Sequence, residues 1–246
     1  MLTPLILFLV GIIASFVSGM IGGGSGLILT PAQLLLGIDP RIATTSTHFG
    51  FIGVSLGAMA RFRREGDIRA EFTLPLTAIS LISGLCGPYL LMSIDSSVLQ
   101  RIVGALILIC VPLFLLKGSL GMARGSSSRA RLLIGYVVFF LILLLQVAFG
   151  AATGVIAIFV LVYFFGLSMI ETSAALRLPN LVSSLVGLMV YQSFGQLDFT
   201  YGVTLLIAMA LGGYLGSHVA IKGGNRLVKG MFCCLAVVLA VLLVAN

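Results

Sequence analysis

Residues 19–37 read GMIGGGSGLILTPAQLLLG and place a run of glycines directly before an apolar segment. A membrane-crossing helix needs about 20 consecutive apolar residues, but the apolar part of this stretch runs only from 25 to 37. A second cluster of small residues, GAATG at 150–154, precedes another short apolar segment at 152–166. Clusters of glycine and other small residues interrupt regular structure. The two stretches therefore predict two short, interrupted membrane segments in one chain.

The composition places the whole chain in the class of helical membrane proteins. Hydrophobic residues make up 60% of the sequence, charged residues 9%, and the mean hydropathy is +1.23. A soluble domain carries about 25% charged residues. Apolar runs follow one another along the chain without a long hydrophilic insertion, so we expect one transmembrane domain over residues 1–246. The first twenty residues lack the basic start of a cleaved signal peptide and are expected to remain as a helix.

The cysteines predict no metal site. They lie inside apolar runs without the spacing of metal ligands, where cysteine behaves as a small hydrophobic residue. These residues are Cys86, Cys110, Cys233 and Cys234. We accordingly expect neither a metal nor a cofactor.

Charges, glycines and prolines divide the chain into apolar segments that fall into two sets of five. The segments run over 3–18, 25–37, 40–62, 71–92, 97–117, 131–148, 152–166, 169–192, 199–221 and 226–245. A gap-free offset of 129 residues pairs Gly37 with Gly166, Gly66 with Gly195, Gly84 with Gly213, Gly87 with Gly216 and Ser55 with Ser184. The short segments are second in each set. This predicts an all-α polytopic protein with repeat one at 1–120, a linker at 121–129 and repeat two at 130–246.

The loop charges predict that the two repeats have opposite orientations, because basic residues favour cytoplasmic loops. The loop after the third segment carries Arg61, Arg63, Arg64 and Arg69. Its counterpart in the second repeat, QSFGQLD, has no basic residue, and the next pair of loops reverses this difference. The basic central linker is then cytoplasmic. We expect a multi-pass protein of the bacterial inner membrane with both termini periplasmic. Topology accounts for the net charge of +7, so no nucleic-acid partner is expected.

Inverted repeats with interrupted segments are typical of secondary transporters, whose substrate site lies near the membrane midplane where the repeats meet. Arg177 is the strongest candidate for that site. It lies in the apolar stretch 169–191, and the nearest other charge is Glu171. A guanidinium in this setting is costly unless it faces a polar cavity or a partner. We expect it to bind a small anion, with a structural bond to Glu171 or to a carbonyl as the alternative.

The repeat offset places His48 opposite Arg177 and Phe51 opposite Asn180. Counting along the two helices puts His48 and Arg177 at similar membrane depths. We expect Pro179 to weaken helix at Leu178, and the run ATTSTHFG to weaken the helix that carries His48.

Where a membrane helix is weakened, its polar side chains are candidates for binding the substrate. The hydroxyls of residues 44–47, including Thr45 and Ser46, are expected to line a cavity. Asn180 is a further ligand candidate, with hydrogen bonding between helices as its alternative. His48 is either a substrate-contacting and proton-coupling residue or a core histidine with its hydrogen bonds satisfied.

The glycine-rich breaks predict a second contribution to the anion site. Short helices that begin after 19–26 and 150–154 direct their backbone N–H groups toward one centre. Gly23, Gly24, Ser25 and Thr153 are the candidate residues. The alternative for these glycines is close helix packing, because the stretch lacks the lysine of a nucleotide-binding loop.

Small residues at spacings of three to four occur in SGLCGPYL at 83–90 and in LGGYLGSH at 211–218. This pattern allows helices to approach closely. We interpret both stretches as the packing seam between the repeats, with plain packing favoured over a moving gate.

Several of these motifs together resemble the sulfite exporter TauE/SafE family of bacterial anion permeases. The resemblance rests on GMIGGGSGLILTPAQLLLGIDPRIATTST, then FRREGDIRAEFTLPL, then a Gly-x-x-Gly helix, and the same order in the second half. The residues on the family's first motif are glycines 22 to 24, Gly26, Pro31, Gly37, Ala43, Thr45 and Ser46. The resemblance implies an inner-membrane exporter of small sulfur-containing anions such as sulfite, sulfoacetate or sulfolactate, with proton coupling as an option. Ala151, Ala152 and Thr153 replace the triple glycine in the second half, which suggests that the first repeat supplies more of the anion site.

Two functions of other classes stay open at this point. One is a passive anion channel. The other is an intramembrane serine hydrolase that uses Ser25, from GGSG at 23–26, with His218 as its base. The transporter is favoured and the chain is not expected to be an enzyme, because a duplicated, inverted fold has no purpose in a hydrolase. The expected partners are a small anionic substrate and membrane lipid, and a homodimer stays open.

Overall fold

The computed structural model describes residues 2–65, 70–93, 121–122, 128–149, 153–195 and 197–244. The predicted fifth segment, 97–117, lies outside these residues, as do Cys110 and part of the basic linker. The described chain is helical and contains no strand within those ranges. The all-α prediction is therefore confirmed.

The helices follow the predicted segments closely. They are α1 (Leu2–Ile21), α2 (Gly26–Leu35), α3 (Pro40–Glu65), α4 (Ala70–Ser93), α6 (Arg129–Phe149), α7 (Thr153–Phe165), α8 (Met169–Ala175), α9 (Arg177–Ser193) and α10 (Phe199–Val244). Within the described ranges, five helical stretches are long and apolar enough to cross a membrane. They are Leu2–Ile21, Ala70–Leu90, Arg129–Ala148, Met169–Ser193 and Phe199–Leu235. A multi-pass membrane protein is the class that this pattern supports.

The two predicted short segments form the two short apolar helices, α2 and α7. The turn before α2 requires glycine, because Gly22 and Gly24 have φ values of 107° and 91°, a region that residues with a side chain rarely occupy. Helix α7 is buried along nearly its whole length and forms the centre of the largest hydrophobic cluster. A helix this short can stay apolar on all sides because other helices surround it.

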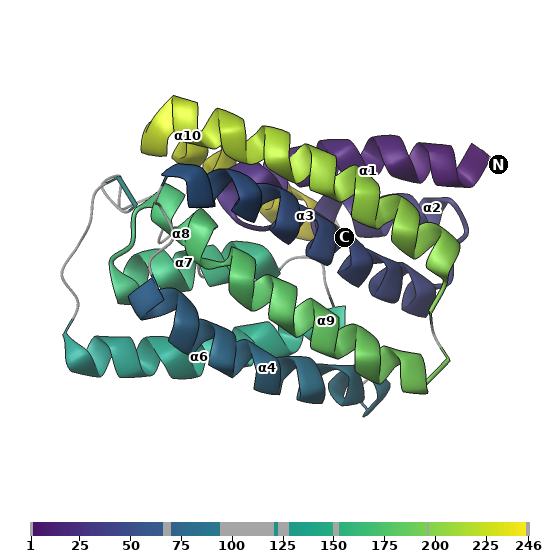
Figure 1. Ribbon diagram of the computed structural model, residues 1–246, viewed down its shortest axis with the longest axis horizontal. Helices are drawn as coiled ribbons and strands as arrows, with labels where there is room; N and C mark the ends of the chain where they lie inside the picture. The colour runs from purple at the N-terminus through teal and green to yellow at the C-terminus, as the bar shows by residue number, and fades with distance from the viewer. Residues whose placement is uncertain are drawn as a thin grey trace.

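The fourth segment of each predicted repeat packs against helices of the other predicted repeat. α10 packs against α1 and α3, whereas α4 packs against α6 and α9, so the helices form the two groups visible in Figure 1. Glycines on α4 and α10 allow these helices to approach their neighbours closely. A Cβ on Gly216 would meet the carbonyl oxygen of Phe16, and one on Gly84 would meet that of Ser183. The small residues at 83–90 and 211–218 thus make the predicted close helix contacts, while the division into repeats stays a prediction.

The basic ends of several elements meet at one end of the molecule. Arg61, near the end of α3, donates from Nε to Nδ1 of His218 in α10 at 3.0 Å. Asn225 of α10 accepts from the backbone N–H of Ile170 at 2.9 Å and donates to the carbonyl oxygen of Met122 at 3.2 Å. The start of α6 lies at this same end, on the left of Figure 1. This grouping is what basic loops on one membrane face require, while the inverted orientation and the periplasmic termini stay predictions.

Two boundaries differ from the predicted segments. The eighth segment is divided at Leu176, between α8 and α9, and not at Leu178. Pro179 causes no break at Leu178 because it lies in the first turn of α9, where backbone N–H groups have no partner within the helix. The ninth and tenth segments join without a loop of several residues, since only Gly224 of α10 departs from helical geometry, with φ 70° and ψ 179°.

Candidate functional site

A small buried cavity lies where the glycine-rich breaks meet α3, α6 and α9. The space open to the centres of water-sized molecules is about 10 Å³, which is what one water molecule needs. The lining residues come from both predicted repeats. They are Ser18, Gly23, Gly24, Ser25, Phe51, Val54, Ser55, Gln146, Gly154, Arg177 and Asn180.

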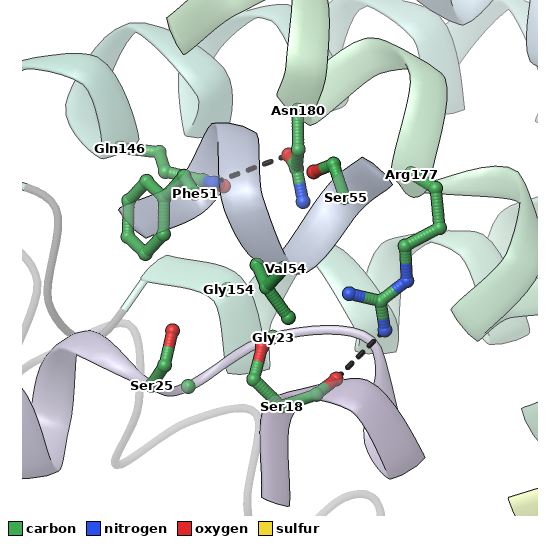
Figure 2. A pocket seen from close by; sticks show the side chains of 11 residues that line it. Ser18, Gly23, Ser25, Phe51, Val54, Ser55, Gln146, Gly154, Arg177 and Asn180 are labelled. Carbon is green, nitrogen blue, oxygen red and sulfur yellow. Dashed lines mark hydrogen bonds between the residues drawn. The ribbon is translucent and has the colours of Figure 1, made fainter. Parts of the chain in front are cut away.

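Arg177 is the only charged side chain among the lining residues that the structure describes, and it is 1% exposed. Its Nε donates to the carbonyl oxygen of Ser173 at 3.0 Å. Its Nη2 donates to the carbonyl oxygens of Ser18 and Gly19 at 2.7 and 3.3 Å and to Ser173 Oγ at 2.9 Å. Nη1 makes no hydrogen bond to any described residue. In Figure 2 one guanidinium nitrogen is directed at Ser18 and another at the middle of the lining residues.

The guanidinium is consequently held in place but not neutralised. All of its acceptors are uncharged carbonyl or hydroxyl oxygens. The predicted alternative pair with Glu171 is not formed, because Glu171 caps α8: its carboxylate accepts from Ser168 N at 3.0 Å and its own N–H donates to Ser168 Oγ at 3.3 Å. The alternative bond to a carbonyl is formed. A buried cation with no carboxylate partner beside a polar cavity makes this cavity a candidate anion site.

Other polar atoms around the cavity are also without partners. The buried Oγ atoms of Ser25 and Ser55 and the Oε1 atom of Gln146 make no hydrogen bond. Gln146 Nε2 donates to Asn180 Oδ1 at 3.1 Å, which joins α6 to α9. Buried polar atoms in proteins are normally paired, so these unpaired atoms make the cavity a candidate binding site.

The two glycine-rich breaks touch each other at the cavity. A Cβ on Gly23 would lie 2.9 Å from the Cα of Gly154, so the backbones are in direct contact. Close packing, the alternative for these glycines, is therefore present at Gly23. The backbone N–H groups of Gly23, Gly24 and Ser25 donate to none of the described residues. Backbone N–H groups before a helix start favour a negatively charged ligand.

The hydroxyls predicted from ATTSTHFG do not line this cavity. α3 is continuous through the run, and the hydroxyls of Thr44, Thr45 and Thr47 donate to the carbonyl oxygens of Pro40, Ile42 and Ala43 in their own helix. The expectation of a weakened helix is wrong, because hydroxyl groups can bond to the preceding turn without opening it. Ser46 is buried and its Oγ is unpaired, but neither Ser46 nor Thr45 is a lining residue.

His48 lies one layer behind the cavity wall. Its ring packs edge-on against that of Phe51, a lining residue, with centroids 5.6 Å apart. Nε2 is 2.9 Å from the carbonyl oxygen of Val147, and Nδ1 is 3.4 Å from Ser184 Oγ. A carbonyl oxygen can only accept, so Nε2 carries a proton. In this conformation His48 has the contacts of a core histidine.

Thr153 and the proposed hydrolase pair complete the set of predicted residues. Thr153 is buried at the first position of α7 with an unpaired Oγ1, next to Gly154, which lines the cavity. Ser25 and His218 form no hydrogen bond with each other. Ser25 Oγ is unpaired, and His218 Nδ1 accepts from Arg61. The structure therefore does not assemble the nucleophile and base of a serine hydrolase.

Three polar cavity residues, Ser18, Gln146 and Ser55, were not assigned to the site by the sequence analysis. Gln146 lies alone in the apolar run LLLQVAF, and the argument applied to Arg177 identifies it as well, since an isolated amide in such a run needs a partner. Ser55 was paired with Ser184 by the repeat offset but was not assigned to a site. Serine is frequent where membrane helices pack, so its sequence context gives no signal of a cavity.

Comparisons with known proteins agree with this architecture. The chain is 27% identical to a probable membrane transporter protein of Haemophilus influenzae over 92% of its own length and 88% of that protein. It is 26% identical to the probable membrane transporter protein YfcA of Escherichia coli K12, over 98% and 90% of the two chains. It is also 26% identical to the probable membrane transporter protein ORF9 of a Sinorhizobium species, over 98% and 92%. No solved structure matches the chain.

The family assignment covers nearly the whole chain, including both glycine-rich breaks and every cavity residue. Residues 7–243 match the sulfite exporter TauE/SafE family. This protein is a membrane transporter that belongs to the sulfite exporter TauE/SafE family.

Proposed function

We propose that the protein exports a small sulfur-containing anion, either sulfite or an organosulfonate such as sulfoacetate or sulfolactate, across the bacterial inner membrane. The observation that supports this most is the guanidinium of Arg177, which is buried, held by uncharged oxygens and unpaired at Nη1 beside the cavity. The sulfur chemistry of the substrate follows from the family, and the negative charge follows from the arginine. An arginine matches an oxyanion well because its planar N–H groups can bond two oxygens at once.

The size of the cavity supports transport by alternating access. Sulfite and the organosulfonates are larger than the single water molecule for which the cavity has room. The described conformation is thus closed around the site, and binding requires the walls to separate. The walls belong to two helix groups: Ser18 and Ser55 lie in the group with α10, and Gln146 and Asn180 lie in the group with α4. A relative movement of these groups opens the cavity.

Proton coupling through His48 is part of this proposal. Ser184 Oγ, beside His48 Nδ1, can donate to a neutral ring or accept from a charged one. Both ring nitrogens of His48 therefore have a hydrogen-bond partner whether or not Nδ1 carries a proton, while Nε2 stays bonded to Val147. Because His48 packs against the lining residue Phe51 but does not itself line the cavity, we infer that a proton on His48 acts on the cavity wall and not by direct contact with the substrate.

The test is counterflow of sulfite in liposomes that contain the purified protein. Liposomes loaded with unlabelled sulfite are diluted into a trace of labelled sulfite. A carrier accumulates the label inside the liposomes transiently, because its binding site exchanges external labelled sulfite for internal unlabelled sulfite. A channel, the second candidate, only equilibrates the label and conducts far above carrier rates. Sulfoacetate, sulfolactate and sulfate inside the liposomes identify which anions exchange. Absence of exchange with every sulfur anion contradicts the proposal.

A further inference from the structure

We propose that the cavity selects an oxyanion that carries a single negative charge and one hydrogen-bond donor of its own. This inference rests on the proposed anion transport and narrows the substrate class. It follows from the charge around the cavity and from the pairing of two amides, Gln146 and Asn180. Hydrogen sulfite, with one charge and one proton, has this composition. Doubly charged sulfite and sulfoacetate do not.

The charge argument concerns Arg177. It is the one charged group among the lining residues that the structure describes, and none of its hydrogen bonds goes to a carboxylate. A singly charged anion neutralises the buried guanidinium. A doubly charged anion leaves a net negative charge in a buried site, and burying an uncompensated charge is strongly unfavourable. The remaining donors, hydroxyl and backbone N–H groups, are uncharged.

The requirement for a hydrogen-bond donor comes from an amide oxygen, which can only accept a hydrogen bond. Gln146 Nε2 donates to Asn180 Oδ1 at 3.1 Å, which leaves Gln146 Oε1 unpaired and buried. If both amides are turned over, Asn180 Nδ2 donates to Gln146 Oε1 and Asn180 Oδ1 becomes the unpaired oxygen. Either arrangement of the pair presents one amide N–H group and one amide oxygen. An oxyanion without a proton offers only acceptors, so it leaves that oxygen unpaired.

The two parts of the site lie apart, which gives the ligand an orientation. Figure 2 shows the amide pair above the middle of the lining residues and the guanidinium of Arg177 to their right, with Val54 and Gly154 below the pair. The deprotonated oxygens of the ligand then face Arg177. Its donor faces the amide oxygen. Ser55 Oγ, also unpaired, can donate or accept beside Asn180.

Three sulfonates test the charge requirement and the donor requirement separately at constant pH. Ethanesulfonate has one charge and no donor, and 2-hydroxyethanesulfonate has one charge and a hydroxyl donor. Sulfoacetate has two charges and no donor. Their dissociation constants for the purified, unmodified chain are measured by titration calorimetry. We expect 2-hydroxyethanesulfonate to bind about 5- to 100-fold more tightly than ethanesulfonate, because it alone pairs the buried acceptor. Sulfoacetate is expected to bind at least about tenfold more weakly than 2-hydroxyethanesulfonate.

A matched pair of variants locates the effect. Gln146→Met removes the amide at similar length, and we expect it to abolish the advantage of the hydroxyl ligand. Gln33→Met is the control: Gln33 is equally buried, accepts from Thr47 at 3.4 Å and does not line the cavity. We expect the control to retain the advantage. If Gln146→Met does not fold, the ligand series on the unmodified chain decides the question by itself.

The outcomes distinguish this inference from the proposed function. Equal affinity for the two singly charged sulfonates overturns the donor requirement, and tightest binding of sulfoacetate overturns the charge requirement. Either result leaves anion transport intact. If none of the three sulfonates binds and sulfite does not bind either, the proposed function fails and this inference fails with it.

Discussion

Gly23 and Gly154 lie backbone against backbone, so that the break before α2 and the start of α7 meet directly beside the cavity. A Cβ on Gly23 would come within 2.9 Å of the Gly154 Cα atom, and the neighbour it meets is main chain, which cannot turn aside as a long side chain can. Both predicted repeats therefore contribute to the cavity wall at a contact that tolerates no side chain.

Gly23→Ala tests this contact. We expect the variant to be destabilised by about 1–3 kcal/mol, the usual effect of overpacking, and to lose most of its transport because the breaks are forced apart at the site. Gly230→Ala is the matched control, since nothing lies within 4 Å of a Cβ there. Thermal unfolding in detergent and liposome uptake measure the two effects. Normal stability and uptake in Gly23→Ala contradict the described contact.

Arg177→Ala is expected to abolish anion binding while the protein is still made. Without the guanidinium the cavity has only uncharged donors, and the carbonyl oxygens of Ser18 and Gly19 each lose one of their donors. Arg177→Lys is expected to recover only part of the binding, because a single ammonium group cannot reproduce bonds to the carbonyls and to the anion together. Titration calorimetry with sulfite measures both variants.

The control for Arg177 is Arg41→Ala, which removes an exposed arginine at the start of α3. It separates loss of the site from loss of net charge. An Arg177→Ala variant that binds and transports sulfite like the unmodified chain removes this residue from the substrate site.

His48→Gln is expected to keep sulfite binding but to flatten the pH dependence of transport. An amide N–H can replace Nε2 as the donor to the Val147 carbonyl, now 2.9 Å away, whereas an amide does not change its charge in the physiological range. Uptake of 2-hydroxyethanesulfonate, whose charge does not change with pH, is measured from about pH 5.5 to 8 with and without a proton gradient, because an ordinary histidine changes charge over this range. A pH profile that stays unchanged assigns His48 a purely structural role.

Ser168→Ala tests how α8 is held. Ser168 Oγ accepts from the Glu171 N–H, and the Glu171 carboxylate accepts from the Ser168 N–H, which together cap the first turn of α8. Loss of the serine hydroxyl is expected to cost about 1 kcal/mol of unfolding free energy. Because α8 also carries Ser173, which holds Arg177, we expect a weaker affinity for sulfite as well. Thermal unfolding and calorimetry measure the two changes. A lower melting temperature with unchanged affinity shows that the cap does not act on the site.

The sequence alone was sufficient for the features that have a single physical solution. A chain with 60% hydrophobic and 9% charged residues can bury so much apolar surface only in a membrane. Glycines 22 and 24 mark a turn that other residues rarely adopt, and the break they predict is present. Arg177 could be assigned to a polar cavity because a cation is too costly elsewhere in an apolar helix. The small residues at 83–90 and 211–218 likewise predicted close contact between the halves.

Only the tertiary structure decided which neutral polar side chains share the cavity with Arg177. Thr45 and Gln146 both lie in membrane helices. The hydroxyl of Thr45 donates to a carbonyl of its own helix, whereas Gln146 of α6 donates to Asn180 of α9. A hydroxyl can bond to the preceding turn in any helix, so its sequence does not reveal which way it faces. That direction depends on the rotation of each helix. The rotation is set by close glycine contacts between segments far apart in the chain, such as α10 with α3 and α4 with α9.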